Sequence, residues 1–173
     1  MTGYVALLRA VNVGGTGKLP MAELKQMCVD EGFDDVKTYI ASGNVVFASG
    51  ASPTGVQIAL EDRLAEYFGK PCSVFVRSAD EMSAILAANP FPDAPGKWTH
   101  VVFLEAPPPK DTIGQVRFRT TEQIALGTRE IYIAYRDGMG RSKLKVPAAE
   151  KGTARNVNTV AKLAELAAER SSR

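Results

Sequence analysis

The sequence has little of the chemistry that cysteine supplies. It contains two cysteines in 173 residues, Cys28 and Cys72, with no CxxC spacing and no Cys/His cluster. Disulfide frameworks and zinc sites need several such residues at characteristic spacings. We therefore expect two reduced cysteines in the core and no metal centre.

Histidine is scarcer still, since His100 is the only one. It has no recognisable Ser/Asp or Cys/Asp partner, so the sequence does not support a hydrolytic triad. Three acidic residues are expected to lie on the solvated face of one predicted helix, namely Glu61, Asp62 and Glu66. Neither a general base nor a nucleophile can be identified, so the sequence leaves enzymatic activity and any cofactor open.

Long apolar runs and a basic leader are also missing. No run approaches the roughly 18 to 20 residues that span a bilayer, and no basic apolar leader precedes Tyr4. We therefore expect a cytoplasmic protein without a membrane partner. With 45% hydrophobic residues, the chain can fold as one domain or as two small subdomains that share a core.

Net charge is low but unevenly distributed. A formal charge of +2 argues against a dedicated nucleic-acid arm. Residues 136–173 nevertheless hold nine Lys/Arg and four Asp/Glu, against twelve and fifteen in the preceding residues. This basic C-terminal part indicates either contact with an anion or a solvated charged face.

The first half of the sequence shows the pattern of a ferredoxin-like fold. Apolar residues over Tyr4–Val13 predict a strand, and Pro20 opens a helical pattern that Gly32 ends. Further elements are predicted as strands at Val36–Ile40 and Val45–Phe47, a helix capped by Ser52, and a strand at Cys72–Val76. In this βαββαβ order the first and second strands are parallel, so the loops that follow them lie at one end of the sheet.

The second half predicts a smaller or partial α+β unit. Ser78 and Glu81 form a capping box for a helix that reaches Asn89, and a Pro/Gly-rich loop follows. We therefore predict an α+β fold of two subdomains, 1–89 and 90–173, the second with a basic arm and a C-terminal helix. Its predicted elements are a strand at Trp98–Glu105, a short helix at Asp111–Val116, a hairpin of Gln123–Leu126 with Glu130–Tyr135, and a helix capped by Asn156 or Asn158.

The loop from Gly14 to Lys18 resembles phosphate-binding loops only in part. A Walker-type loop would need glycine where Asn12 stands and Ser/Thr where Leu19 stands, and a dinucleotide fingerprint would need glycine in place of Pro20. The remaining features are the backbone amides of Gly14 and Gly15 and the cations Arg9 and Lys18. These features support two interpretations about equally, namely anion binding and a plain turn.

Two other polar segments are candidates for the same site. Ser42-Gly43-Asn44 is typical of a hairpin turn, but the topology places it near Asn12 and Lys18. Near the C-terminus, Arg155 and Asn156 precede a helix. A cation at a helix N-terminus is unfavourable by a few tenths to about 1 kcal/mol, which a nearby anion would offset.

Several sequence blocks resemble one known family. The blocks are Leu7–Gly15, Pro20–Leu24, Tyr39–Phe47, Gly140–Leu144 and Thr153–Asn156, and they are similar to the bacterial domain of unknown function 1697 family. The resemblance implies two ferredoxin-like subdomains and no established activity. The chain has Ala10 where the family often has glycine, and Val157 where it often has tryptophan. The family's recurring polar positions correspond to Arg9, Asn12, Ser42, Asn44, Ser142, Lys143, Arg155 and Asn156.

Three functions are compatible with these features. The first is a site for an anionic small molecule, such as a nucleotide, phosphate ester or carboxylate, at the end of the first sheet and closed by the C-terminal arm. Its residues would be Arg9, Asn12, Gly14, Gly15, Lys18, Ser42, Asn44, Ser142, Lys143, Arg155 and Asn156. The second is a purely structural lock between the subdomains, in a protein-interaction module. The third, ranked last, is a nucleic-acid-binding module that uses the basic C-terminal part.

Overall fold

The protein is described by a computed structural model that covers residues 1–14 and 17–171. Contacts divide the chain into two compact units, one of Met1–Ser83 with Lys162–Arg173 and one of Ala84–Ala161. The end of the C-terminal helix therefore belongs to the first unit. Within the described ranges, no helix has both the length and the apolar character that a membrane span requires.

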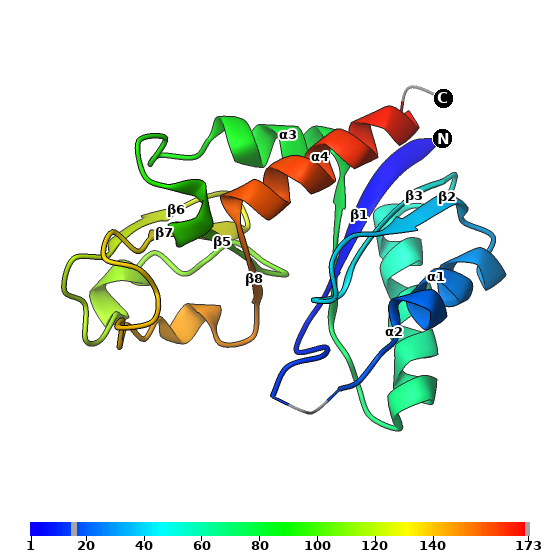
Figure 1. The fold of residues 1–173 in the computed structure, drawn as a ribbon, viewed down its shortest axis with the longest axis horizontal. Helices are drawn as coiled ribbons and strands as arrows, with labels where there is room; N and C mark the ends of the chain where they lie inside the picture. Colours follow the sequence, from blue (N-terminus) through cyan, green and yellow to red (C-terminus); the bar gives the residue numbers. More distant parts are fainter. Residues whose placement is uncertain (15–16, 172–173) are drawn as a thin grey trace. The chain divides into compact units, whose positions relative to one another are not determined.

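The first unit has the predicted ferredoxin-like topology (Figure 1). Its elements are β1 (Thr2–Leu8), α1 (Met21–Asp30), β2 (Asp34–Thr38), β3 (Asn44–Ser49), α2 (Pro53–Phe68) and β4 (Val74–Ser78). The strands form one sheet in the order β2-β3-β1-β4, and every neighbouring pair is antiparallel. The βαββαβ prediction is confirmed.

Local signals set the helix starts in this unit. The Ser52 Oγ accepts the Gly55 N–H at 3.1 Å and Pro53 follows at the first helical position, which caps α2. The predicted capping box is also present, because Glu81 accepts the Ser78 N–H at 3.0 Å and Ser78 Oγ accepts the Glu81 N–H at 3.1 Å. It opens α3 (Ala79–Ala87).

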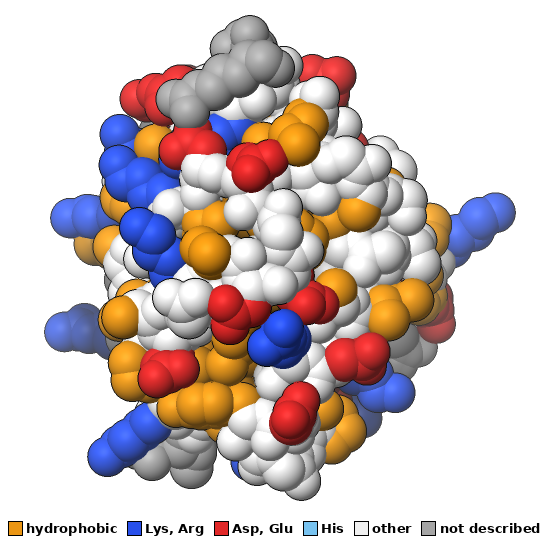
Figure 2. Space-filling view, turned by 90° about the vertical axis from the view of Figure 1, so that its right-hand side faces the viewer, with side chains coloured by type: hydrophobic (Ala, Val, Ile, Leu, Met, Phe, Trp, Pro, Cys, Tyr) orange, Lys and Arg blue, Asp and Glu red, His pale blue; other side chains and the backbone are white. Residues whose placement is uncertain are grey.

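Helices α1 and α2 are charged on their outer side. Arg63 of α2 donates to Glu31, at the end of α1, with a Nη2–Oε2 distance of 3.2 Å. Figure 2 views the molecule from the side on which Figure 1 draws these helices, and acidic, basic and apolar side chains are interspersed there. This face of the first unit therefore carries mixed charge.

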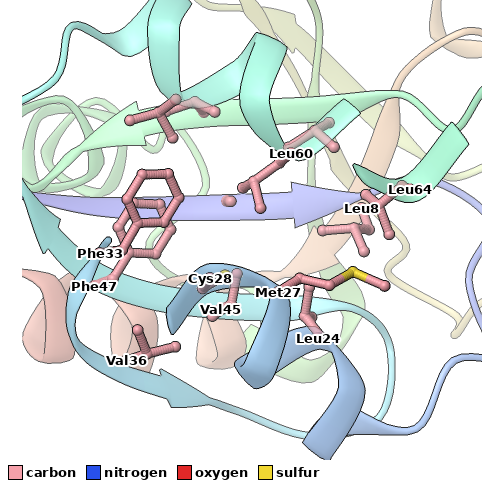
Figure 3. Close-up of a cluster of buried hydrophobic side chains, with 14 of the residues drawn as sticks. Leu8, Leu24, Met27, Cys28, Phe33, Val36, Val45, Phe47, Leu60 and Leu64 are labelled. Carbon is pink, nitrogen blue, oxygen red and sulfur yellow. The ribbon is translucent and has the colours of Figure 1, made fainter. Parts of the chain in front are cut away.

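The core of the first unit lies between the sheet and the inner sides of α1 and α2 (Figure 3). Leu24 and Cys28 of α1 and Leu60 of α2 are fully buried there. The rings of Phe33 and Phe47 stack with centroids 4.4 Å apart. The apolar spacing that predicted both helices is thus the spacing that fills this core.

The last part of α4 (Val157–Ser171) packs against β1 in the same unit. The Gly3 N–H donates to Ser171 Oγ at 2.9 Å, and a Cβ at Gly3 would overlap the Ala167 carbonyl oxygen. The buried Arg170 donates from Nε to the Asp35 carbonyl at 2.7 Å. These contacts fix the end of α4 in the first unit.

The second unit contains another four-stranded antiparallel sheet. Its strands are β5 (Thr99–Phe103), β6 (Gln123–Leu126), β7 (Glu130–Ala134) and β8 (Thr153–Asn156). They lie in the order β6-β7-β5-β8, which repeats the strand order of the first sheet. The connections contain short 3-10 turns, Ile113–Gln115 before β6 and Pro147–Ala149 before β8, where the first sheet has α-helices.

Some predicted boundaries need correction. The strand predicted over Tyr4–Val13 ends at Leu8, because Ala10 and Asn12 have left-handed backbone with φ of 57° each. The helix predicted over Asp111–Val116 is only a 3-10 turn. The polar segment around Arg155 and Asn156 was predicted only as the start of a helix. It also contains β8, whose backbone pairs with β5.

Candidate functional site

The end of the first sheet brings two of the predicted polar segments together. Asn12 Nδ2 donates to the Ala41 carbonyl at 2.7 Å and to the Leu19 carbonyl at 2.9 Å. Asn12 Oδ1 accepts the Leu19 N–H at 2.8 Å. The predicted neighbourhood of the loop after β1 and the turn after β2 is confirmed, and Asn12 holds the two together.

Asn44 fixes the turn after β2. Its side chain is fully buried and donates to the Tyr39 carbonyl at 3.0 Å and to Ser42 Oγ at 2.9 Å. Both amide hydrogens of Asn44 are therefore used inside the turn. The contacts of Asn12 and Asn44 show that these side chains shape the two loops.

The backbone at this end is unusually rich in left-handed residues. Besides Ala10 and Asn12, Ile40 has φ of 51°. Gly43 has φ of 85°, and a Cβ there would lie 2.9 Å from the Leu8 Cβ. A left-handed non-glycine residue costs about 1 to 2 kcal/mol. Strain of this kind concentrates at functional sites and in tightly constrained turns.

The remaining predicted groups at this end are accessible. Arg9, Gly14 and Lys18 are exposed, whereas Gly15 lies outside the described residues. The Arg9 N–H donates to the Ser73 carbonyl at 3.0 Å, which anchors the start of the loop beside β4. Two exposed cations thus flank a loop whose backbone is fixed at both ends.

Four predicted site residues, Ser142, Lys143, Arg155 and Asn156, belong to the second unit. The convergence of these residues with those of the first sheet stays a prediction. Asn156 Oδ1 accepts the Thr159 N–H at 2.9 Å, so Asn156 caps α4 as one of the two predicted candidates.

Arg155 lies on β8 and is buried. Its Nη1 donates to Thr153 Oγ1 at 2.6 Å and to the Ala154 carbonyl at 2.9 Å. Burial lowers the pKa of the Arg155 guanidinium to about 10, so the side chain is cationic at neutral pH.

Ser142 lines a hollow of about 530 Å³ in the second unit. The polar and aromatic residues around this hollow are Trp98, Thr120, Thr121, Glu122, Tyr135, Arg136, Asp137, Arg141 and Ser142. Its size falls in the range of roughly 300 to 1,000 Å³ that is typical of small-molecule sites. Arg136 and Arg141 are exposed, and Trp98 is half-buried.

Glu122 is held as a carboxylate at this hollow. Desolvation raises its pKa, but the hydrogen bonds donated by the Thr120 N–H at 2.7 Å and Ser142 Oγ at 2.8 Å outweigh it, so the pKa is lowered overall. Burial, followed by the Glu122 charge, raises the pKa of Tyr135. Ser142 therefore donates to an ionised carboxylate.

Burial shifts the pKa values of both cysteines and of His100. Burial, with a smaller effect of Glu31, raises the pKa of Cys28 to about 12, and burial raises the pKa of the half-buried Cys72. Burial lowers the pKa of His100, whose Nδ1 has no hydrogen-bond partner. In the part of the chain that the structure describes, no three His, Cys, Asp or Glu residues are grouped to hold a metal.

Ser142 was a predicted site residue, whereas the hollow around it was not predicted. The signal was present in the predicted hairpin of β6 and β7, because antiparallel strands bring the residue before one strand beside the residue after the other. Segments 117–122 and 135–145 flank that hairpin. They are adjacent for this reason, although Trp98 comes from a third segment.

The two sheets define an α+β protein built on a repeated strand order, with the first unit ferredoxin-like. The chain belongs to the DUF1697 family, described as proteins of unknown function, whose model matches residues 1–132. It is similar to a solved structure of the conserved bacterial protein SP0830 from Streptococcus pneumoniae. The two share 26% identity with a TM-score of 0.79, over 96% of this chain and 98% of that one. No curated protein matches the chain.

Proposed function

We propose that the protein binds a small anionic molecule, such as a nucleotide, phosphate ester or carboxylate, at the end of the first sheet. The observation that supports this is the Asn12 clamp, which joins the loop after β1 to the turn after β2. A binding loop fixed in advance loses less conformational entropy when a ligand binds. The strained backbone of both segments is consistent with such a role.

The charge of the ligand would be neutralised mainly by Arg9 and Lys18, which are exposed at the two ends of the loop. Hydrogen bonds from cations to carboxylate or phosphate oxygens are about twice as strong as neutral ones. The backbone amides of Gly14 and Gly15 would orient the anion.

A panel of anions tests this function. The melting temperature is measured with inorganic phosphate, adenosine monophosphate, glucose 6-phosphate and citrate. We expect at least one of them to raise it in a saturable manner. Lys18→Gln and Arg9→Gln should each weaken that effect, whereas Lys25→Gln, an exposed lysine on α1, should not. A wild-type protein that responds to none of these anions would contradict the proposal.

A structural role is the second candidate, and the contacts of Arg155 favour it. The buried guanidinium donates to Thr153 and Ala154 within β8. Arg155→Ala should lower the free energy of unfolding by about 1 to 3 kcal/mol, because buried acceptors lose their donor. Chemical denaturation measures this loss, with the exposed Lys143→Ala as the control. If Arg155→Ala leaves the free energy of unfolding unchanged relative to Lys143→Ala, the structural role is contradicted.

A further inference from the structure

We propose that the second unit binds single-stranded nucleic acid across the surface formed by segments 117–123 and 136–145 together with Trp98. We call this the Trp98 surface. The proposal is independent of the anion site on the first sheet, because every residue of the Trp98 surface lies in the second unit.

Hydrogen bonds hold the two segments side by side. The backbones of Arg117 and Lys145 exchange two hydrogen bonds of 2.9 Å each. Further along, Arg136 Nε donates to Gln123 Oε1 at 2.6 Å. The bond from Ser142 to Glu122 lies between these contacts. The two segments therefore lie side by side in the second unit.

This surface has a marked excess of positive charge. The two segments contain six Lys/Arg residues and two acidic residues. All six cations are exposed, and they are Arg117, Arg119, Arg136, Arg141, Lys143 and Lys145. Of the two acids, Glu122 is buried and its carboxylate accepts hydrogen bonds from three donors. Asp137 accepts a hydrogen bond from Thr121 Oγ1 at 2.8 Å. A run of phosphates would be attracted to these cations with release of counterions.

Aromatic side chains are interleaved with the cations. Phe118 stands between Arg117 and Arg119 and is 62% exposed, which is unusual for a phenylalanine. Trp98 and Tyr135 line the hollow beside Arg136 and Arg141. Proteins that bind single strands combine cations along the backbone with aromatic rings on which bases stack. The hollow of about 530 Å³ is large enough to receive a nucleobase.

The cations of α4 do not share this arrangement. Lys162 pairs with Glu165 at 3.5 Å. The buried Arg170 pairs with Asp35, also at 3.5 Å. The outer side of α1 and α2 is mixed in charge (Figure 2). The exposed cations that can bind phosphates therefore lie in segments 136–145 and 117–119, and not along α4.

Trp98 is the only tryptophan, so its fluorescence reports on this surface alone. We expect a fluorescently labelled 15-nucleotide oligo(dT) to bind the full-length protein and to quench Trp98 emission. If four to six phosphates are contacted, the logarithm of the association constant should fall with the logarithm of salt concentration with a slope of about −3 to −4.

Three variants separate the contributions of charge and stacking. The double variant Arg136→Gln/Arg141→Gln should weaken binding and make the salt slope shallower by about 1 to 2. Phe118→Ala should weaken binding roughly fivefold or more without changing the slope, because stacking does not release counterions. The matched control Lys25→Gln/Lys37→Gln removes two exposed cations of the first unit and should leave binding unchanged.

The competing ligands give outcomes that would overturn the proposal. Thymidine 5′-monophosphate that binds as tightly as the oligonucleotide would identify the site as one for a free nucleotide. Polyglutamate that competes as well as oligo(dT) would identify a general polyanion surface. Absence of oligonucleotide binding, or binding that the Arg136/Arg141 and Phe118 variants leave intact in correctly folded protein, would also overturn it.

Discussion

Asn12 shows how a single side chain can organise a loop. Both of its amide hydrogens and its carbonyl oxygen are engaged, with Leu19 and Ala41 as partners. The residue itself has left-handed backbone, a conformation that asparagine tolerates better than most residues. Its contacts make Asn12 a support for the loop that carries Arg9 and Lys18, and its role in ligand binding stays a prediction.

We expect Asn12→Ala to lower the free energy of unfolding by about 1 to 3 kcal/mol, since three hydrogen bonds are lost at once. Chemical denaturation measures the change. The control is Gln26→Ala, whose side-chain amide makes an exposed hydrogen bond to Asp30 and should cost less than about 0.5 kcal/mol. An Asn12→Ala variant as stable as the Gln26 control would show that the clamp does not hold the loop.

His100 predicts a pH effect on stability. Burial lowers its pKa below the ordinary value of 6.5, so the unfolded chain binds a proton more readily than the folded one. Stability should therefore fall as the pH drops below about 6.5, toward the lower pKa of the folded state. Melting temperatures from pH 8 to pH 5 test this, and the decline should be smaller in His100→Phe. Parallel curves for the two proteins would contradict the predicted pKa.

At the scale of elements, α4 approaches β1 closely at Gly3. A Cβ at Gly3 would meet the Ala167 carbonyl and Ser171, whereas a Cβ at Gly50 would meet nothing within 4 Å. Gly3→Ala should therefore lower the free energy of unfolding by about 1 to 3 kcal/mol through overpacking. Gly50→Ala is the control and should change it little. Equal effects of the two substitutions would mean that α4 does not pack closely on β1.

Elements whose signals are local could be predicted from the sequence. Two helix starts are predicted by short capping motifs, Ser52 with Pro53 and Ser78 with Glu81. The hydrogen bonds of both caps are present. The end of β1 could not be predicted, because apolar residues continue to Val13 while the backbone turns left-handed at Ala10. Strand β8 was missed because its pairing with β5 is non-local.

For the candidate sites too, only part of the arrangement could be predicted from the sequence. The topology of the first sheet was sufficient to place the loop after β1 beside the turn after β2. It could not show that Asn12 and Asn44 use their amides internally, since hydrogen-bond partners depend on positions within a few tenths of an ångström. The Trp98 surface was missed because Arg117 and Arg119 are far in sequence from Arg141. The pairing of β6 with β7 and the backbone bridge between Arg117 and Lys145 bring their segments together.

At the scale of the molecule, the chain repeats one strand order with two kinds of connection. The first sheet is crossed by the helices α1 and α2, which supply its core. The second sheet has 3-10 turns and irregular segments in their place. Those irregular segments carry the exposed cations and Phe118 of the Trp98 surface, whereas Trp98 lies just before β5. The strand-end loops of the first sheet carry the proposed anion site.

Titration of the 15N-labelled protein with the panel anion that raises the melting temperature most, followed amide by amide by NMR, tests the anion site most directly. We predict saturable shifts that are largest at Arg9, Gly14 and Lys18, and a weaker apparent affinity in Lys18→Gln. Shifts that are absent, that do not saturate, or that are largest outside the loop after β1 would contradict an anion site at the end of the first sheet.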